Sequence, residues 1–312
     1  MRILITGGTG YIGSYLFFFF KKLGYDVLIA SRKNYDEINW IKKNEIIKYD
    51  LNRNTKIFDI INNVDLVIHS AGMNHMDCNN NPEQAINFNY KVTIDLIEES
   101  IRNKVKNFIF LSTYHVYKSD LSGTLKENSE TNNTHSYAVS KSLTEKHLLK
   151  IYSEKKIKGT ILRLSNIYGV PVSKDINCWH LFINDFCKQV IINKSILIKS
   201  NFFQERNILS LKNLALIINN LINKKDKIEN FPYLFNIGSN LTYSLKEVAE
   251  TISKRSKLIL GYTPSIILND NFYKKKEKLI YDIELMQRYH LFQYENLYDE
   301  IDSLLLFCKK YF

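Results

Sequence analysis

The chain has 312 residues, 45% hydrophobic and 24% charged, which is typical of a globular protein of one or two domains. Its formal net charge of +11 comes from scattered lysines and arginines, without a long basic tail or interleaved aromatic residues. This pattern favours a solvated lysine-rich surface, and we expect no nucleic-acid partner.

The four cysteines are far apart in the sequence and form no C-x-x-C pair: Cys78, Cys178, Cys187 and Cys308. Such spacing indicates reduced thiols in a cytosolic protein, and we expect neither disulfides nor a metal site. The apolar run Phe17–Phe20 ends at Lys21, far short of the ~18 apolar residues that a membrane helix needs. A secretory n-region is missing, so the sequence predicts a cytoplasmic protein without a membrane partner.

Short apolar runs alternate with segments of helix length in the first half of the chain. Buried strands are predicted at Arg2–Thr6, Asp26–Ala30, Asp65–His69 and Asn107–Leu111. Helices are predicted at Tyr11–Leu23, which Gly24 ends, and around Pro82–Ile101. This alternation predicts an α/β fold, a doubly wound parallel sheet with helices on both faces.

The alternation is less regular after about residue 165. Helices are predicted at Leu181–Ile192 and Leu211–Ile222, and another begins at Ser244, with Glu247 completing a capping box. We therefore expect a Rossmann NAD(P)-binding domain at residues 1–165. Residues 166–312 are expected to form a smaller α/β substrate-binding domain, interleaved with the last strands of the sheet.

A glycine-rich loop follows the first strand and opens the first helix. It reads Thr6, Gly7, Gly8, Thr9, Gly10, Tyr11, Ile12 and Gly13. Glycines at this spacing permit a tight turn and a close approach of the backbone to a pyrophosphate, which the helix N-terminus then binds. A simple turn would also use glycines, but the strand–loop–helix–strand context favours a dinucleotide.

The end of the second strand distinguishes the two nicotinamide cofactors. A carboxylate there binds the adenosine 2′-hydroxyl of NAD(H), whereas an arginine accommodates the 2′-phosphate of NADP(H). The chain has Ser31, Arg32 and Lys33, with no acid before Asp36. This favours NADP(H). NAD(H) is the alternative, in which Arg32 lies in solvent and Asp36 folds back to the ribose.

Tyr137 and Lys141 lie four residues apart on a predicted helix and therefore share one face of it. A nearby ammonium favours the phenolate and is expected to lower the pKa of Tyr137 toward neutrality. Tyr137 would then serve as the acid or base of a carbonyl–alcohol interconversion. A pair at this spacing is common in a chain with 20 tyrosines, so it needs support from other motifs.

Further motifs appear in a fixed order along the chain: Leu111–Tyr117, Tyr137-x-x-x-Lys141, Arg163–Gly169 and Phe235–Ser239. With them the chain resembles the extended short-chain dehydrogenase/reductases, in particular the NAD(P)-dependent sugar epimerase/dehydratase family, over nearly its full length. The resemblance implies that Thr113 completes a Thr–Tyr–Lys triad and holds the reacting sugar oxygen. Lys141 would also bind the nicotinamide ribose.

The resemblance also implies contacts to the cofactor and to the substrate. Cofactor contacts are implied at Asp50 and Leu51 near the adenine, at Ser70, Ala71 and Gly72, and at Asn89. Asn166 and Arg206 are implied to bind a nucleotide-activated sugar, and an arginine suits its phosphates because the guanidinium can grip oxygens bidentately. The chain departs from the family pattern at three positions. It has Lys118 where the family has glycine, Asn207 where it has aspartate, and Ser210 where it has histidine.

Members of the family that dehydrate sugars carry an acid and a base directly after the triad threonine. This chain has Tyr114 and His115 there, which disfavours dehydration. Related keto-sugar epimerase/reductases use a cysteine and a histidine as two proton-transfer groups. His115 with Cys178 or His180 is therefore a candidate proton relay, the alternative being that His115 bonds within its loop and Cys178 packs as a small apolar residue.

The leading hypothesis is an NAD(P)-dependent nucleotide-sugar epimerase or 4-keto reductase, and relatives suggest a homodimer formed through two long helices. Because a fold does not determine a function, the alternative is a non-catalytic dinucleotide-binding regulator or an RNA-binding relative. Such relatives typically lose the tyrosine or the lysine, and this chain retains both Tyr137 and Lys141.

Overall fold

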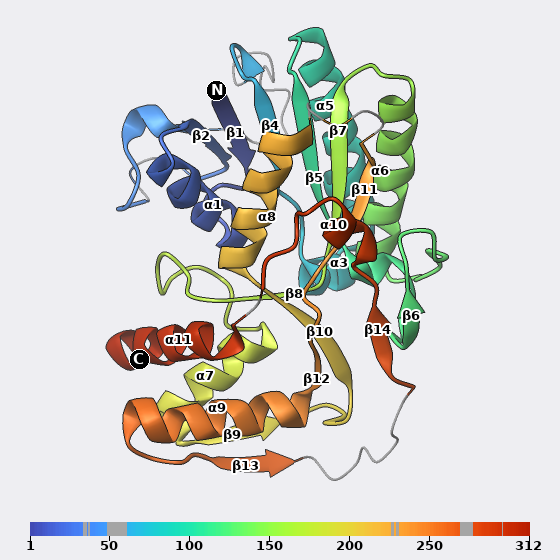
Figure 1. The fold of residues 1–312 in the computed structure, drawn as a ribbon. Coiled ribbons are helices and arrows are strands. Elements are labelled where there is room, and N and C mark those ends of the chain that lie inside the picture. Colours follow the sequence, from blue (N-terminus) through green and yellow to red (C-terminus); the bar gives the residue numbers. More distant parts are fainter. Residues whose placement is uncertain are drawn as a thin grey trace. The chain divides into compact units, whose positions relative to one another are not determined.

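The structure, a computed structural model (Figure 1), describes residues 1–33, 36, 38–48, 61–225, 228, 231–268, 277–294 and 296–312. The chain forms two compact units, each assembled from distant segments. The first unit comprises Met1–Ser119, Ser129–Arg163 and Asn230–Phe235. The second comprises Asp120–Asn128, Leu164–Glu229 and Asn236–Phe312.

The first unit is built on a seven-stranded sheet with the order β11-β7-β5-β4-β1-β2-β3. Its strands are β1 (Arg2–Thr6), β2 (Asp26–Ser31), β3 (Ile46–Lys48), β4 (Leu66–His69), β5 (Asn107–Thr113), β7 (Lys158–Leu164) and β11 (Leu234–Ile237). β1 pairs in parallel with both β2 and β4, and β4 pairs in parallel with β5. The predicted doubly wound sheet is confirmed.

The direction of winding reverses between β1 and β4. Right-handed crossovers therefore place the helices of the two halves on opposite faces of the sheet. α1 (Tyr11–Lys22) lies on one face, and α5 (Val92–Arg102) and α6 (Ser136–Ser153) lie on the other (Figure 1). Ligands of such sheets bind beyond the carboxyl ends of the strands at the point of reversal, here the ends of β1 and β4.

A buried cluster fixes α5 and α6 on the sheet. The strands contribute Leu4, Val67, Phe108 and Phe110, and the two helices contribute Leu96, Ile97, Leu148 and Ile151. Each of these side chains is at most 6% exposed. Burial of one such side chain contributes roughly 1.5–3 kcal/mol, so the cluster holds α6, and any group on it, firmly against β5.

The segment predicted as one helix around Pro82–Ile101 is interrupted. It consists of α4 (Pro82–Ile86), a π-helical turn at Asn87–Lys91, and α5. A short helix, α3 (His75–Asn80), precedes it. A π-helical turn displaces backbone carbonyls from the regular helical ladder, and such turns often occur at functional sites.

The second unit has three small sheets, ordered β12-β10-β8, β13-β9 and β14-β6. Their strands are β6 (Gly123–Leu125), β8 (Asn166–Tyr168), β9 (Ser195–Ile198), β10 (Glu205–Ser210), β12 (Thr242–Ser244), β13 (Ser265–Leu268) and β14 (Leu279–Tyr281). Its helices are α7 (Phe182–Asn193), α8 (Leu211–Lys224), α9 (Leu245–Leu260), α10 (Glu284–Arg288) and α11 (Leu297–Tyr311).

The core of the second unit is formed by α7, α9, α11 and β9. It includes Phe186, Val190, Ile198, Val248, Ile252, Ile301 and Leu304. The predicted capping box is confirmed: the Ser244 hydroxyl accepts from the Glu247 N–H at 3.2 Å, and Glu247 accepts from the Ser244 N–H at 2.7 Å.

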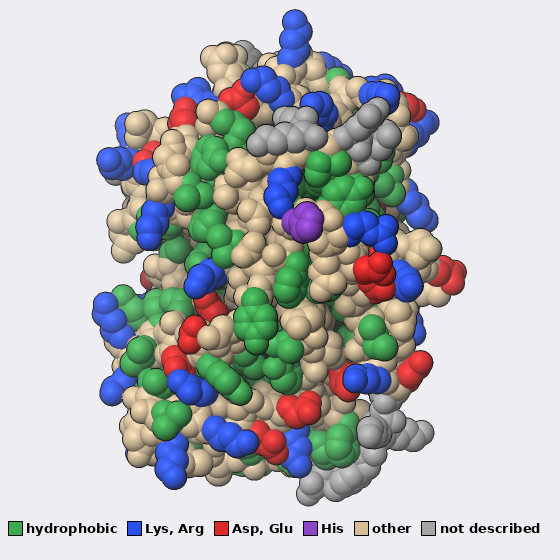
Figure 2. Space-filling view, in the orientation of Figure 1, with side chains coloured by type: hydrophobic (Ala, Val, Ile, Leu, Met, Phe, Trp, Pro, Cys, Tyr) green, Lys and Arg blue, Asp and Glu red, His purple; other side chains and the backbone are tan. Residues whose placement is uncertain are grey.

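On the face shown in Figure 2, Lys and Arg side chains are dispersed among acidic and neutral ones.

Candidate active site

Steric crowding explains the glycines of the loop between β1 and α1. Gly7 has φ +67°, which side chains rarely permit, and a Cβ on Gly13 would lie 2.4 Å from the carbonyl oxygen of Gly7. No side chain caps α1 at Gly10, and its first turn carries no acidic residue. Because a 12-residue helix has a partial positive charge at this end, the loop fits a pyrophosphate.

A chain of hydrogen bonds links this loop to the π-helical turn. Thr93 Oγ1 donates to the Asn89 carbonyl at 3.0 Å, so it accepts the proton on Nε2 of His69 at 2.9 Å. Nδ1 of His69 consequently accepts from the Thr6 hydroxyl at 2.7 Å. Burial lowers the pKa of His69 to about 3, so the ring stays neutral at physiological pH. His69 therefore joins the ends of β1 and β4 without introducing charge.

The loop after β4 brings together the residues that were predicted to line the cofactor. The Ser70 hydroxyl donates to the Thr6 carbonyl at 2.7 Å. A Cβ on Gly72 would lie 3.0 Å from Oδ1 of Asn89 and 3.4 Å from Nζ of Lys141. Glycine at position 72 therefore allows the side chains of Asn89 and Lys141 to approach this loop closely.

Asn89 is 1% exposed, and its hydrogen bonds connect the π-helical turn, the loop after β4 and α6. Its Oδ1 accepts from the Met73 N–H at 2.7 Å, and its Nδ2 donates to the Ser140 hydroxyl on α6 at 3.2 Å. The Thr144 hydroxyl, also on α6, donates to the Asn89 carbonyl at 2.9 Å. The π-helical turn thus fixes α6 relative to the loop that follows β4.

The end of β2 carries the predicted cofactor-discriminating residues. The hydroxyls of Ser31 and Thr9 hydrogen-bond at 2.8 Å, which connects β2 to the glycine loop. Arg32 is exposed, and its guanidinium carbon lies 5.5 Å from the centre of the Phe88 ring. Asp36 is exposed as well. The predicted adenine contacts, Asp50 and Leu51, lie outside the described residues.

The structure brings Thr113, Tyr137 and Lys141 together at the carboxyl end of β5. Thr113 is the last residue of β5, and its hydroxyl hydrogen-bonds to the side chain of Tyr137 on α6. Lys141 lies one turn further along α6 and donates to the Leu111 carbonyl at 3.1 Å. Its Nζ lies 4.6 Å from the centre of the Phe110 ring.

The prediction that Lys141 lowers the pKa of Tyr137 toward neutrality is wrong for the chain alone. Burial raises the pKa of Tyr137 to about 12, and the hydrogen bond with Thr113 offsets this only in part. Burial also lowers the pKa of Lys141 to about 8, against the influence of Cys78 and Glu145. Removing both groups from water disfavours both charged forms, an effect that sequence spacing does not reveal.

A buried ion pair lies directly behind the triad. Glu145 on α6 is 2% exposed and binds the Arg163 guanidinium on β7, which is 5% exposed, through contacts of 2.7 and 3.1 Å. Ser112, next to Thr113, donates its hydroxyl to Glu145. The Arg163 guanidinium carbon lies 4.7 Å from the centre of the Tyr117 ring. Although burial alone would lower the pKa of Arg163, Glu145 and Tyr117 together raise it.

Two histidines that the sequence did not single out lie beside the triad. The His75 and His135 rings are stacked, with centroids 3.8 Å apart and planes 12° apart. The centroid of the His75 ring is 6.3 Å from that of Tyr137 and 6.4 Å from that of His115. The available signal was their position, three residues after Gly72 and two before Tyr137.

The predicted substrate residues meet in the second unit. Asn166 donates through Nδ2 to the Asn207 carbonyl at 2.9 Å, and Arg206, next to Asn207 on β10, is half-buried. Two departures from the family pattern have structural causes. The Asn207 amide donates to the Ser239 carbonyl at 2.8 Å and to the Leu241 carbonyl at 3.1 Å, which a carboxylate could not do. Ser210 caps α8 by accepting from the Asn213 N–H at 3.1 Å.

The three residues of the predicted proton relay belong to different units. His115 is in the first unit, whereas Cys178 and His180 are in the second. Cys178 is buried, and burial raises the pKa of its thiol to about 12. His180 lies near the surface, and its Nδ1 hydrogen-bonds to Oδ1 of Asn177 at 3.2 Å.

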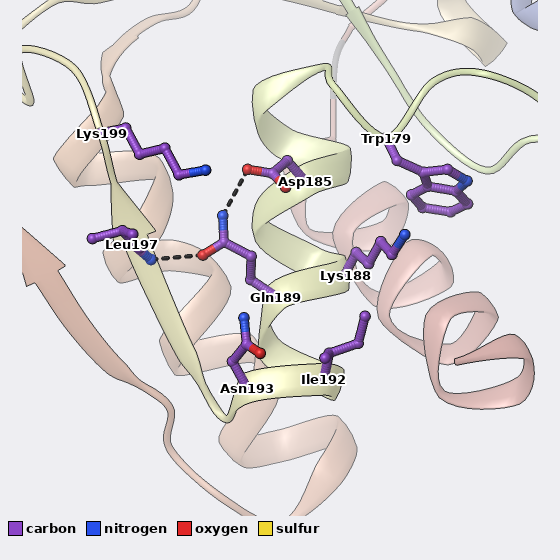
Figure 3. Close-up of a pocket in the computed structure, with 8 residues that line it drawn as sticks. All are labelled: Trp179, Asp185, Lys188, Gln189, Ile192, Asn193, Leu197 and Lys199. Atoms are coloured by element: carbon purple, nitrogen blue, oxygen red, sulfur yellow. Dashed lines mark hydrogen bonds between the residues drawn. The ribbon is translucent and has the colours of Figure 1, made fainter.

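A cavity of about 300 Å³ lies in the second unit, between α7 and β9 (Figure 3). Gln189 lies at its centre, where its amide donates to Asp185 at 2.6 Å and accepts from the Leu197 N–H at 2.7 Å. The lining comprises one indole, two lysines and other mostly polar groups: Trp179, Asp185, Lys188, Gln189, Ile192, Asn193, Leu197 and Lys199.

In the described part of the chain, no group of three or more His, Cys, Asp or Glu side chains could hold a metal ion. None of the helices among those residues is both long and apolar enough to cross a membrane.

The fold and the site define a class of protein: a Rossmann dinucleotide-binding unit with a Thr–Tyr–Lys group at the carboxyl end of β5. The chain belongs to the NAD dependent epimerase/dehydratase family, whose model matches residues 3–238. This confirms the family that the sequence motifs predicted.

Sequence relatives include both branches of the family. The chain is 29% identical to a dTDP-D-glucose 4,6-dehydratase of Dictyostelium discoideum, over 80% of this chain but 61% of the relative. It is 24% identical to a UDP-glucose 4-epimerase of Haemophilus influenzae, over 84% of this chain and 85% of the relative. Among solved structures, a UDP-glucuronic acid 4-epimerase of Bacillus cereus in complex with UDP-glucuronic acid and NAD matches all of both chains, with 21% identity and a TM-score of 0.81.

Proposed function

We propose that the chain is an NAD(P)-dependent nucleotide-sugar epimerase or 4-keto reductase in which Tyr137 moves the proton at the sugar oxygen. The observation that carries this proposal is the hydrogen bond between Thr113 and Tyr137, with Lys141 one turn further along α6. Membership of the epimerase/dehydratase family and the named activities of the relatives support the same reading.

Thr113, Tyr137 and Lys141 have different roles at the sugar. A bound dinucleotide supplies the redox chemistry and, when oxidised, a positively charged ring. The Thr113 hydroxyl holds the sugar oxygen while Tyr137 takes its proton as the carbonyl forms, or returns the proton as the alcohol forms. Because Tyr137 is half-buried and Lys141 is 5% exposed, water screens their interaction only in part, and Lys141 as an ammonium stabilises the phenolate.

Dehydration of the 4,6 type is the third reaction of the family, and several relatives carry that name. It needs an additional acid and base near the ketone. Directly after Thr113 the chain offers Tyr114, which is 1% exposed, and His115, whose ring packs on Tyr114 with centroids 4.6 Å apart. Without a carboxylate pair at these positions, we favour epimerisation or reduction.

The two favoured reactions differ in their use of the cofactor. A reductase consumes one external NADPH for each sugar reduced, whereas an epimerase returns its cofactor to the starting state. Following absorbance at 340 nm together with the identity of the sugar product distinguishes them.

We infer a preference for NADP(H) from Arg32, because an exposed guanidinium at the end of β2 suits a 2′-phosphate. Replacing Arg32 by serine is expected to weaken NADPH binding about 10- to 100-fold, since a charge-assisted hydrogen bond contributes roughly 1.5–3 kcal/mol. NADH binding should stay within about threefold. Titration calorimetry measures both, with Arg288→Ser on α10 as the matched control. Tighter binding of NADH than NADPH by the unmodified chain would contradict the preference.

We propose that the second unit binds the nucleotide part of the substrate. Arg206 and Asn166 are the candidates for the diphosphate and the sugar, as the family pattern implies. The cavity between α7 and β9 offers an indole face, two lysines and an amide, which suit a base and its phosphates.

Trp179 provides a direct readout of nucleotide binding to this cavity. With Trp40 replaced by phenylalanine, Trp179 is the only remaining tryptophan of the two in the chain. Titration of this variant with UDP, dTDP, GDP and CDP is expected to quench its fluorescence most strongly for the nucleotide that the substrate carries. Trp179→Ala should weaken binding of that nucleotide by about 10-fold, because stacking of a base on an aromatic ring contributes roughly 1–3 kcal/mol. Unchanged fluorescence with every nucleotide would contradict a role for the cavity.

The relay of His115 with Cys178 or His180 remains a proposal for epimerisation beside a ketone. The raised pKa of Cys178 makes its thiolate scarce near pH 7, so His180 is the better partner. His115→Ala and Cys178→Ala variants that keep full turnover and full incorporation of solvent deuterium would eliminate the relay.

We also propose a homodimer, as relatives suggest, and a cytoplasmic location, for which the four buried free cysteines are the support. The alternative function is a non-catalytic dinucleotide-binding regulator or an RNA-binding relative. RNA binding that survives high salt, together with full activity of a Tyr137→Phe variant, would favour that alternative.

A further inference from the structure

The stacked histidines lie within the first unit and reach the catalytic tyrosine. His75 is the first residue of α3, and His135 precedes α6. Besides stacking on His135, the His75 ring approaches the Tyr137 ring edge-on, with planes 66° apart and centroids 6.3 Å apart. His75 is exposed, so a sugar held at Tyr137 could contact it.

The His135 ring caps the N-terminus of α6. Its Nδ1 accepts from the backbone N–H of Tyr137 at 3.2 Å. Asn133 Oδ1 accepts from the backbone N–H of His135 at 2.9 Å, and the Ser136 hydroxyl donates to the Cys78 carbonyl at 2.8 Å. These bonds attach the segment before Tyr137 to α3, and they hold the two rings face to face.

His75 is the ring of this cluster that is available for proton transfer. Within the described residues, no hydrogen bond engages its nitrogens, whereas Nδ1 of His135 is occupied. Partial burial and the neighbouring His135 lower the pKa of His75, so its ring is neutral near pH 7 and can accept a proton. The other titratable rings that face it are those of His115 and Tyr137. The Cys78 thiol, whose pKa burial raises, is on the same helix α3.

We propose that His75, held on His135, is a second proton-transfer group of this site and acts on a carbon adjacent to the ketone of a nucleotide-linked 4-keto sugar. The inference rests on the proposed function and narrows it to chemistry beside the carbonyl. The C–H bond breaks, the proton passes to an imidazole nitrogen of His75, and the electron pair forms an enolate. The Tyr137 and Thr113 hydroxyls stabilise the enolate oxygen, and a proton delivered from water to the opposite face gives the epimer. The hydroxide that remains takes up the proton that His75 releases to solvent, which returns the site to its starting state.

Exchange of solvent deuterium into a 4-keto sugar tests this proposal by NMR or mass spectrometry. His75→Gln is expected to slow incorporation at the adjacent carbon at least about 100-fold, the low end for loss of a general base. Binding of the sugar and single-turnover reduction of its ketone should both stay within about threefold, because they depend on Tyr137. His147→Gln, a histidine elsewhere on α6, is the matched control and should exchange normally. Exchange at the normal rate in His75→Gln would overturn the proposal.

A second variant separates proton transfer from a merely structural role. His135→Asn keeps a good helix cap but removes the stacked ring, and with it an influence that lowers the pKa of His75. The acidic limb of the exchange profile should therefore move to higher pH. The titration of His75 followed by 15N NMR, which needs no cofactor, should move in the same direction. An unchanged titration would contradict the coupling of the two rings.

The outcomes also distinguish this inference from the function on which it rests. Conversion of a nucleotide sugar without deuterium incorporation would overturn the role of His75 alone. Failure of the chain to convert any nucleotide sugar would overturn both.

Discussion

Replacing Tyr137 by phenylalanine is expected to lower kcat about 10³-fold for any sugar that the chain converts, while binding of the dinucleotide stays within about threefold. The expected loss is that of a general acid–base group, which contributes 10²- to 10⁴-fold. The change removes one hydroxyl, whose partner is Thr113, and leaves the ring in place. Steady-state kinetics together with titration of the cofactor measures both quantities.

Tyr90→Phe is the matched control for this prediction. Tyr90 lies in the π-helical turn of the same unit, and its hydroxyl contacts Nδ1 of His147 at 3.5 Å. Its loss should leave kcat within about twofold. A Tyr137→Phe variant with normal turnover would remove the main support for the enzymatic function.

Replacing Glu145 by glutamine is expected to destabilise the first unit by about 3–5 kcal/mol, because it leaves the Arg163 guanidinium buried without its partner charge. Arg163 is 5% exposed, so water cannot compensate. For a unit of this size the melting temperature should fall by roughly 10 °C. Amides of β5 and α6 should lose protection from hydrogen exchange, since Glu145 joins these elements through Ser112.

Two further variants make this second prediction specific. Glu284→Gln breaks an ion pair on α10 whose side chains are each 67% exposed, and it should cost less than about 1 kcal/mol. In the double variant Glu145→Leu and Arg163→Met, both buried charges are absent, so most of the stability should return. A single Glu145→Gln variant as stable as the unmodified chain would show that the buried pair contributes nothing.

The sequence predicted those parts of the fold and site that depend on local signals. The glycine loop, four of the seven strands of the sheet and the Ser244–Glu247 capping box are each encoded within a few residues. The proximity of Thr113 to Tyr137 was predicted from the order of motifs along the chain. The packing of α6 on β5 brings the two residues together.

The remaining features depend on contacts between distant segments. His75, His115 and His135 are separated by 40 and 20 residues, so their clustering depends on the loops that join α3, β5 and α6. The pKa of Tyr137 was predicted in the wrong direction, because spacing on a helix reports a neighbouring charge but not the loss of water.

The departures from the family pattern in the second unit also needed the structure. Asn207 is one of the positions at which the chain departs from the family pattern. Its amide donates to the Ser239 and Leu241 carbonyls, and its Oδ1 lies 2.2 Å from where a Cβ on Gly238 would be. The substitution therefore has a role in packing that a pattern of residue types could not reveal.

The most direct test of the proposed function is conversion of a panel of nucleotide-linked sugars and 4-keto sugars, with NADPH or NADH, and identification of each product by NMR. We expect a sugar epimerised at C4 or at a carbon beside it, formed without net change in cofactor, or a 4-hydroxy sugar formed with loss of one NADPH for each molecule reduced. A product that has lost water across C5 and C6 would contradict the preference against dehydration. Bound dinucleotide with no conversion of any sugar would contradict the proposed function itself.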